Sequence, residues 1–401
     1  MRIIYLHQYF VTPEMNGGTR SYEFAKRLVA AGHQVHMITS DRTKTGEPYE
    51  TVEAGIRVTW IPVRYSNRMG AFARIRAFIT FAVRSALIAA RSEADIIFAT
   101  STPLTIAIPG VYAKRRRKVP MVFEVRDPWP DMLIGLGAIR NPFIKFAAHR
   151  FERFAYRNSE RIIALSEGMK EVVTSTGYPQ ERVTVIPNAS DIHRFGVPAS
   201  EGQAFRQQFE WLRNRKLVLY AGTIGTANGV DYLVQTAKAM LAIDDEVRFL
   251  TIGTGGQEQQ VRALAEETGT LGRNFFMLPP LPKSAIPACF SATDLSLVLL
   301  KDVKELWTNS SNKFFDGLAA GRPVAVNNTG WQADLLNHSC AGFDVDPRDH
   351  SAAARKLHRH LMDQEWLCKA GRNARDLAVN QFDRNMLAEK FEGVLVSAIG
   401  S

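Results

Sequence analysis

Lys313 and Asp316 stand three residues apart within residues 308–330, TNSSNKFFDGLAAGRPVAVNNTG. The polar residues before them, which include Ser311 and Asn312, are good helix N-caps, and the apolar spacing that follows predicts a short helix over 313–320. The N-terminus of such a helix carries free N–H groups and partial positive charge, so it suits a phosphate, and Lys313 adds a full charge. One turn later, Asp316 could accept hydrogen bonds from the vicinal hydroxyls of a sugar. An ordinary helix-to-strand connection in a parallel sheet explains the same pattern.

Three glycine-rich stretches follow predicted strands. Paired glycines at a helix entrance let backbone N–H groups approach a phosphate or a sugar closely, although each stretch is equally compatible with a simple turn. None of the three is a dinucleotide fingerprint or a Walker loop. Their glycines and threonines are Gly17 and Gly18 in the first, Gly222, Thr223 and Gly225 in the second, and Gly253 and Thr254 in the third. The first two stretches hold equivalent places in two halves of the chain, which makes a diphosphate ligand plausible.

The sequence FEVRDPWPD, residues 123–131, follows another apolar strand. Pro128 forces an extended backbone at Asp127, so this carboxylate is presented at a strand end, where it could deprotonate a hydroxyl or orient a sugar. A structural salt bridge of Arg126 with a neighbouring acid is the alternative. Trp129 could stack on a sugar or cap the core.

Basic residues are concentrated in the first half of the chain. Residues 1–190 hold 27 Lys and Arg against 16 Asp and Glu, so they contain the whole of the net charge of +10. Residues 67–91 predict an amphipathic helix punctuated by arginines that include Arg68, and residues 114–118, KRRRK, add a second basic cluster. Such a helix can lie at an anionic membrane surface, although a core helix with snorkelling arginines shows the same pattern.

These candidate residues need a framework of parallel strands. Strand-like apolar runs alternate with amphipathic segments through the 401 residues, which predicts an α/β protein with two doubly wound domains facing a cleft. The expected domains are residues 1–195 and 203–383, with a C-terminal helix at about 384–401 packing back on the first domain. Residues 187–202, PNASDIHRFGVPASEG, suit a hinge. With no apolar run of membrane-spanning length and no signal-peptide pattern, we expect a cytoplasmic protein.

The ordered motifs resemble the retaining GT-B glycosyltransferases of family 4 over nearly the full length. The matching segments are NGGTRSYEFAKRLVAAGHQV, PNASDIHRF, YAGTIGTANGVDYLV, IGTGGQEQQVRALA, FFMLPPLPKSAIPACFSATDLSLVLL and NKFFDGLAAGRPV. EVRDPWPDML is similar to a branch that makes bacterial surface polysaccharides, including transferases of N-acetyl-L-fucosamine (FucNAc).

The resemblance implies roles for individual residues. A nucleotide diphosphate sugar would bind mostly to the second domain, with Lys313 neutralising the diphosphate beside Gly222, Thr223 and Gly225. Asp316 would hold the ribose, one methylene shorter than the usual glutamate. The resemblance also places Asp127 beside the reacting sugar and Gly17 and Gly18 over the phosphates.

Two departures from the family pattern concern charge. Thr308 replaces the first glutamate of the paired-glutamate motif, and a usual Arg and Lys are absent from the loop after the linker, where Asn228 lies near the lysine's place. The negative charge of the diphosphate would then be neutralised by Lys313, Arg322, Arg20 or Arg126. Arg20, Arg126 and Trp129 are expected on the acceptor side.

The expected function is therefore transfer of a sugar from a UDP-linked donor to a lipid-diphosphate-linked saccharide, without a metal or resident cofactor, at the inner face of the cell membrane. The alternatives are an epimerase or phosphorylase on the same fold, or a basic membrane-binding scaffold without activity. Nucleic acid is not an expected partner.

Overall fold

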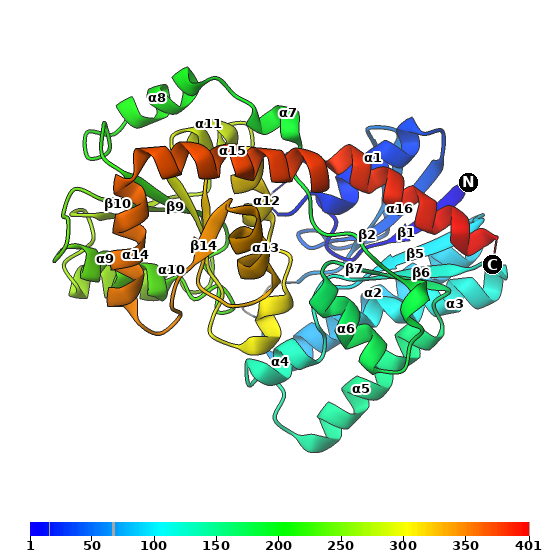
Figure 1. The fold of residues 1–401 in the computed structure, drawn as a ribbon. Coiled ribbons are helices and arrows are strands. Elements are labelled where there is room, and N and C mark those ends of the chain that lie inside the picture. Colours follow the sequence, from blue (N-terminus) through cyan, green and yellow to red (C-terminus); the bar gives the residue numbers. More distant parts are fainter. Residues whose placement is uncertain (16, 66–68, 401) are drawn as a thin grey trace. The chain divides into compact units, whose positions relative to one another are not determined.

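A computed structural model describes residues 1–15, 17–65 and 69–400. The chain forms two compact units, unit 1 from Met1–Pro187 with Asn385–Ser401, and unit 2 from Asn188–Arg384 (Figure 1). Asn16 of the first glycine loop, and Asn67 and Arg68 of the predicted amphipathic helix, lie outside the described residues. Both units are Rossmann-like α/β domains.

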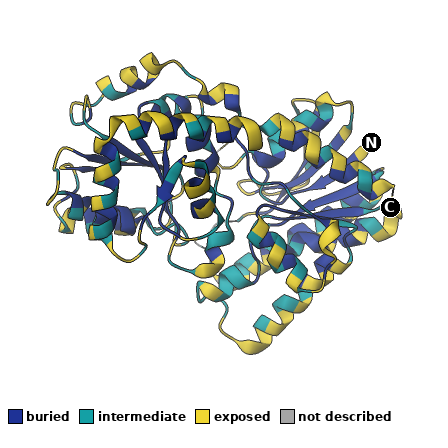
Figure 2. Ribbon diagram, viewed as in Figure 1, coloured by how far each residue is buried: buried dark blue, intermediate teal, exposed yellow. Residues whose placement is uncertain are grey.

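The sheet of unit 1 has eight strands in the order β3-β4-β2-β1-β5-β6-β7-β8. Every neighbouring pair is parallel except β3 and β4, which are antiparallel at the edge. The strands β5 and β6 are buried throughout, as parallel strands covered on both faces should be (Figure 2). The bounds are β1 Arg2–Leu6, β2 Gln34–Asp41, β3 Tyr49–Glu53, β4 Ile56–Pro62, β5 Ile96–Thr100, β6 Met121–Val125, β7 Arg161–Ala164 and β8 Val183–Val185.

Helices cover both faces of this sheet. One face carries α1 (Arg20–Ala30) and α16 (Arg384–Ile399), where Phe391 stacks on Phe24 with ring centroids 5.0 Å apart. The other face carries α2, α3, α5 and α6, which share one apolar core with the strands (Figure 1). Their bounds, with those of the short helices of unit 1, are α2 Ala71–Arg91, η1 Leu104–Ile106, α3 Ala107–Arg117, α4 Asp131–Gly135, α5 Pro142–Arg157, α6 Glu167–Ser175 and η2 Gln180–Arg182.

Unit 2 has an all-parallel six-stranded sheet in the order β11-β10-β9-β12-β13-β14. Two separate apolar cores lie on its two faces. The strands are β9 Leu217–Ala221, β10 Arg248–Ile252, β11 Phe275–Leu278, β12 Leu295–Val298, β13 Val324–Val326 and β14 Gly342–Asp344. The helices are α7 Ile192–Phe195, α8 Ala199–Gln207, α9 Asp231–Met240, α10 Glu258–Glu267, α11 Ile286–Ser291, η3 Lys304–Thr308, α12 Asn312–Ala319, α13 Trp331–Ser339, α14 His350–Met362 and α15 Gln364–Gln381.

The segment expected to be a linker is mostly part of unit 2. The division falls between Pro187 and Asn188, and the chain returns to unit 1 between Arg384 and Asn385. The reason is packing, because Ile192 and Phe195 of α7 and Phe205 of α8 join an apolar core of unit 2. Unit 2 therefore begins earlier than residue 203, and its first residues lie beside the helix that carries Lys313.

Candidate functional site

Two glycine-rich loops pack backbone to backbone at the carboxyl edge of the unit 2 sheet. The N–H of Gly222, after β9, donates to the carbonyl of Ile252 at 2.9 Å. A Cβ placed on Gly253, after β10, would lie 2.0 Å from the Gly222 carbonyl oxygen, so a side chain at this position has no room. Gly253 therefore has a structural reason to be glycine, and its contact with a ligand stays a prediction.

The structure brings Lys313 to the first of these loops. A Cβ on Gly222 would lie 2.7 Å from Cε of Lys313, and the ammonium lies 4.8 Å from the ring centroid of Tyr220. Its hydrogen bond, at 3.3 Å, goes to the hydroxyl of Ser311, the N-cap residue of α12. Among the described residues, no carboxylate forms an ion pair with it. The structure thus places Gly222 beside Lys313, and the contact of both residues with a diphosphate stays a prediction.

The electrostatics of Lys313 favour an anionic ligand. Burial lowers the pKa of its ammonium to about 8, and the charge of Asp316 opposes that change only in part. A buried cation without a counter-ion is costly in the free protein. The site therefore holds positive charge, beside the N-terminus of α12, that a phosphate would neutralise.

Asp316 lies one turn further along α12 and is held by the start of unit 2. The Ser190 hydroxyl donates to its carboxylate at 2.8 Å, and the N–H of Asn188 donates to the Ser310 hydroxyl at 3.0 Å. Burial raises the pKa of Asp316 to about 6, against the opposing effects of Ser190, Arg384 and Arg194. Ser190 was not predicted as a site residue, although it lies in the PNASDIHRF motif.

The other donor-side candidates lie around this point with less distinctive contacts. The Thr254 hydroxyl donates to Glu258 at 2.6 Å, and Asn312 is exposed at the start of α12. Gly225 lies near the side chain of Asn228, since a Cβ there would be 3.4 Å from its Oδ1. Thr223 is exposed on the same loop, and its carbonyl accepts from the Tyr220 hydroxyl at 2.7 Å.

Unit 1 places a buried ion pair at the carboxyl edge of its own sheet. Nε and Nη2 of Arg20 donate to one oxygen of Glu124, at 3.0 and 2.8 Å, and the two side chains are 3% and 0% exposed. Arg20 also donates to the carbonyls of Ile186 and Pro187, and the Thr100 hydroxyl donates to the second Glu124 oxygen at 2.6 Å. The salt bridge at this edge is therefore between Arg20 and Glu124, and the alternative of a salt bridge of Arg126 with a neighbouring acid is not found among the described residues. A contact of Arg20 with an acceptor remains a prediction, and the geometry gives this residue a structural role.

Asp127 and Arg126 lie at the same edge and are half-buried. The Thr102 hydroxyl donates to one Asp127 oxygen at 2.6 Å, which fixes the carboxylate. Arg126 donates to Nε2 of His7 at 3.2 Å and forms no ion pair among the residues that the structure describes. Burial, and then the nearby Arg126 charge, hold the pKa of His7 well below its usual range, so the imidazole is neutral and can accept this bond.

His7 and Gln8 are polar residues that the sequence analysis did not single out. Both follow β1 at the carboxyl edge and are 3% and 1% exposed. Neither amide atom of Gln8 has a hydrogen-bond partner among the described residues. Their signal in the sequence is the pair His-Gln directly after the buried end of β1, residues 3–6.

Trp129 and the first glycine loop have simpler surroundings. Trp129 packs against the apolar core of unit 1, and its indole N–H is buried without a partner in the described part of the chain. Gly17 has a φ of +134°, which favours glycine, and a Cβ there would lie 3.4 Å from Val11. Gly18 is exposed. Stacking of Trp129 on a sugar and phosphate contacts of the glycines stay predictions.

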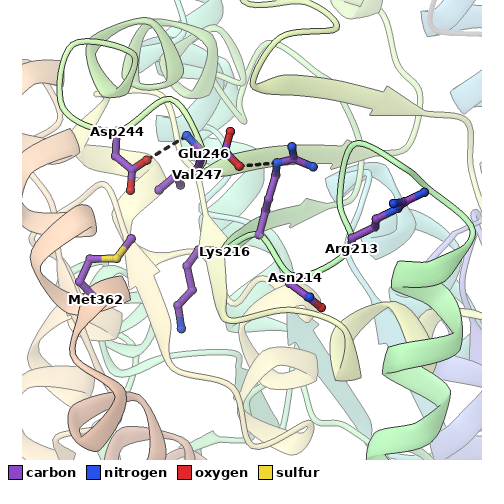
Figure 3. Close-up of a pocket in the computed structure, with 8 residues that line it drawn as sticks. Arg213, Asn214, Lys216, Asp244, Glu246, Val247 and Met362 are labelled. Carbon is purple, nitrogen blue, oxygen red and sulfur yellow. Dashed lines mark hydrogen bonds and ion pairs between the residues drawn. The ribbon is translucent and has the colours of Figure 1, made fainter.

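A surface pocket of about 410 Å³ lies elsewhere in unit 2 (Figure 3). Its residues adjoin the amino ends of β9 and β10, at the edge of the sheet opposite the glycine loops. The charges that line it already have partners, since Arg215 pairs with Glu246 at 2.6 Å and Lys216 with Asp294 at 3.7 Å. This pocket therefore does not compete with the Lys313 site.

Family models match both units. Residues 17–189 match the glycosyl transferase 4-like domain, and residues 202–377 match glycosyl transferases group 1. The chain belongs to the family 4 glycosyltransferases, which have the GT-B fold.

Curated relatives agree with the family assignment, and solved structures agree with the fold. WcaI of Escherichia coli, named as a colanic acid biosynthesis glycosyl transferase, is 27% identical over 307 residues, which are 72% of this chain and 74% of WcaI. The D-inositol 3-phosphate glycosyltransferase of Xylanimonas cellulosilytica is 24% identical over 90% of this chain and 85% of its own. The sucrose-phosphate synthase of Thermosynechococcus elongatus has a TM-score of 0.80 at 16% identity, covering 100% of this chain and 99% of its own. Anabaena HepE, solved with UDP and glucose, has a TM-score of 0.75 at 18% identity, covering 99% of this chain and 100% of its own.

Proposed function

We propose that this glycosyltransferase moves a sugar from a UDP-linked donor to a saccharide carried on a lipid diphosphate. The observation that carries the donor half is the Lys313 ammonium, half-buried at the N-terminus of α12, against Gly222 and without a carboxylate partner among the described residues. A diphosphate supplies the missing negative charge.

The donor would bind to unit 2 through backbone groups and one full charge. In the first turn of α12 the N–H of Phe314 donates to the Ser311 carbonyl at 3.1 Å, so the N–H groups that would meet a phosphate are those of Asn312 and Lys313. Gly222 leaves space for the stem of Lys313, because a Cβ at residue 222 would lie 2.7 Å from Cε of the lysine. Asp316, held by Ser190, would accept from the ribose hydroxyls. HepE, a structural neighbour, was solved with UDP and glucose, which supports the choice of nucleotide.

The reaction proposed here replaces one bond to the anomeric carbon with another. The acceptor hydroxyl oxygen bonds to the anomeric carbon, the bond to the diphosphate oxygen breaks, and the hydroxyl proton passes to the departing phosphate. Lys313 and the N–H groups of α12 stabilise the charge that grows on that phosphate, without a metal. We propose retention of configuration, as in the family pattern.

Asp127 would orient the acceptor or polarise its hydroxyl. One of its oxygens is fixed by Thr102, which leaves the other for a ligand. Arg126, whose cation has no acidic partner in the described part of the chain, is suited to the diphosphate of a lipid-linked acceptor. Both residues follow β6, so they are presented at the edge of unit 1 where open α/β sheets bind ligands.

The pathway proposed is bacterial surface polysaccharide synthesis. WcaI is named for colanic acid biosynthesis, and another relative, CapM of Staphylococcus aureus, is named for capsular polysaccharide biosynthesis. We propose an N-acetylated deoxyhexosamine such as FucNAc as the sugar, and an anionic membrane surface at the inner face of the cell membrane as the place of reaction. Of the helices in the described part of the chain, none is long and apolar enough to cross a bilayer.

The first test is a thermal-shift screen of the purified protein against UDP, GDP, CDP and ADP without metal. A nucleotide at 100 times its Kd stabilises the folded state by about 2.7 kcal/mol. We expect a shift with UDP, followed by turnover of UDP-sugars with lipid-linked acceptors. Absence of a shift with every nucleotide, together with absence of turnover, would overturn the proposal in favour of a non-catalytic scaffold.

A further inference from the structure

The N-terminal part of α5 projects from unit 1 with large apolar side chains in solvent. Phe143 is 83% exposed, Phe146 is 67% exposed and Ile144 is 55% exposed. The helix enters the core only later, where Ala155 and Tyr156 are buried. Figure 2 shows the exposed end of α5 extending beyond the other helices of unit 1. Exposed apolar residues this large and this close together mark an interaction site.

The helix α2 carries a second apolar stripe. Its exposed large side chains recur every three or four residues, which places them along one side of the helix, opposite the buried side that includes Phe81. An amphipathic helix was predicted here, and in the structure its apolar residues are divided between core and solvent. The exposed members of the stripe are Phe72, Ile75, Ile79, Val83 and Leu87, with exposed fractions between 47% and 83%.

The N-terminal ends of α2 and α5 lie at one edge of the sheet. Helices α2, α3, α5 and α6 share one face, and each runs back from the carboxyl edge toward the amino edge, as right-handed crossovers require. The first turns of α2 and α5 are therefore at the carboxyl edge. Asp127 and Arg126 lie at that same edge, after β6.

The charge around this surface is positive. No acidic residue occurs in α2, which contains Arg74, Arg76, Arg84 and Arg91. In α5, Arg150, Arg153 and Arg157 are exposed, whereas its one acid, Glu152, is 2% exposed and accepts from the Tyr156 hydroxyl at 3.0 Å. A surface that combines exposed phenylalanines with arginines that form no ion pair among the described residues fits an anionic lipid bilayer better than it fits an apolar protein face.

We infer that unit 1 docks on an anionic bilayer through the ends of α2 and α5, and that Phe143, Ile144 and Phe146 enter the headgroup region as an inserting tip. This docking would set Asp127 and Arg126 close to the surface from which a lipid-linked acceptor is presented. The role of docking in acceptor presentation rests on the proposed function, whereas binding of unit 1 to the bilayer does not.

The test is sedimentation of the full chain with vesicles. One set contains phosphatidylcholine alone and the other contains equal parts of phosphatidylcholine and phosphatidylglycerol. We expect binding to the anionic vesicles that weakens with salt, and a partition constant at least about tenfold lower for the double variant Phe143→Ser, Phe146→Ser. The matched control is Val52→Ser, because Val52 is also an exposed apolar residue of unit 1, at 73%, but lies on the edge strand β3.

Two further measurements separate the outcomes. The thermal shift with UDP should be the same in the parent and all variants, so its absence from the parent would count against the proposed function and not against docking. A Phe146→Trp variant should show blue-shifted emission on anionic vesicles. Equal vesicle binding by parent and double variant would overturn the inference, as would a dimer in gel filtration that the double variant abolishes while no form binds vesicles.

Discussion

Replacing Lys313 by methionine should weaken UDP binding and, at the same time, stabilise the free protein. Methionine keeps the apolar stem that packs against Gly222 and removes only the charge. Two opposite charges about 4 Å apart at an effective dielectric constant of about 20 attract by about 4 kcal/mol. Loss of one partner of a desolvated charge pair costs about 2–5 kcal/mol. We therefore expect a Kd for UDP about 100-fold higher.

The stability of the free protein should change in the opposite direction. The pKa of Lys313 falls from 10.5 in the unfolded chain to about 8 in the fold, because burial disfavours the ammonium. Below pH 8 both states carry the proton and the full penalty applies. As pH rises from 8 to 10.5, the unfolded state binds more protons than the folded state, so the parent gains stability. Since the side chain is only half-buried, the variant should be more stable by about 1–2 kcal/mol at pH 7, an advantage that shrinks toward pH 10.5.

The assay is chemical denaturation of parent and variant, with and without UDP, at pH 7 and again at about pH 9.5, within the window between the two pKa values. Lys238→Met is the matched control, because Lys238 is an exposed lysine of α9 in the same unit. It should change neither the UDP shift nor the pH dependence. A Lys313→Met protein that is less stable without UDP and keeps the parent's UDP shift would refute the reasoning.

The remaining predictions concern the acid of unit 1, its ion pair and the glycine loops. Asp127→Asn should lower kcat by about 10²–10⁴ with the Kd for UDP unchanged, and full transfer activity in a folded variant would contradict its role. Glu124→Gln should cost unit 1 about 3–5 kcal/mol in the free energy of unfolding, because it leaves the Arg20 charge buried, and a urea-denaturation loss under about 1 kcal/mol would disprove this. Gly253→Ala should lower both the melting temperature and UDP affinity, because its Cβ would lie 2.0 Å from a carbonyl oxygen, whereas Gly256→Ala, with no atom within 4 Å, should stay within about 0.5 kcal/mol of the parent. Equal melting temperatures for the two alanine variants would show that the loop adapts.

The alternation of apolar strands and amphipathic helices predicted both sheets because buried parallel strands are continuous apolar runs. The edge strand β3, Tyr49–Glu53, was not predicted, because its sequence YETVE contains no continuous apolar run and its residues alternate between half-buried and exposed. Composition suggested a hinge for residues 187–202, but Ile192 and Phe195 found partners in unit 2 that no local pattern reveals.

Part of the candidate site could be predicted from the sequence, because the strand pattern also indicates which loops lie at the carboxyl edge of a parallel sheet. Lys313 and Gly222 could each be placed at the carboxyl end of a parallel strand, and the fold brings such ends together. The Arg20–Glu124 ion pair joins residues 104 positions apart in the sequence. Whether Arg20 or Arg126 pairs with Glu124 depends on which of the two side chains turns into the core, and no local pattern shows this. The bond from Ser190 to Asp316 likewise depends on how the first residues of unit 2 pack.

The return of the last helix to unit 1 affects the order in which the chain can fold during synthesis. Phe391 of α16 lies among Tyr5, Phe24 and Phe98, so the core of unit 1 lacks a central ring until α16 has left the ribosome. Unit 2 is one continuous segment and can complete its own core first. At about 5–20 residues per second, its synthesis takes on the order of 10–40 s, during which the first segment waits with an uncovered apolar face. The nascent chain therefore exposes apolar surface, the feature that chaperones bind, for longer than a protein with two sequential domains would.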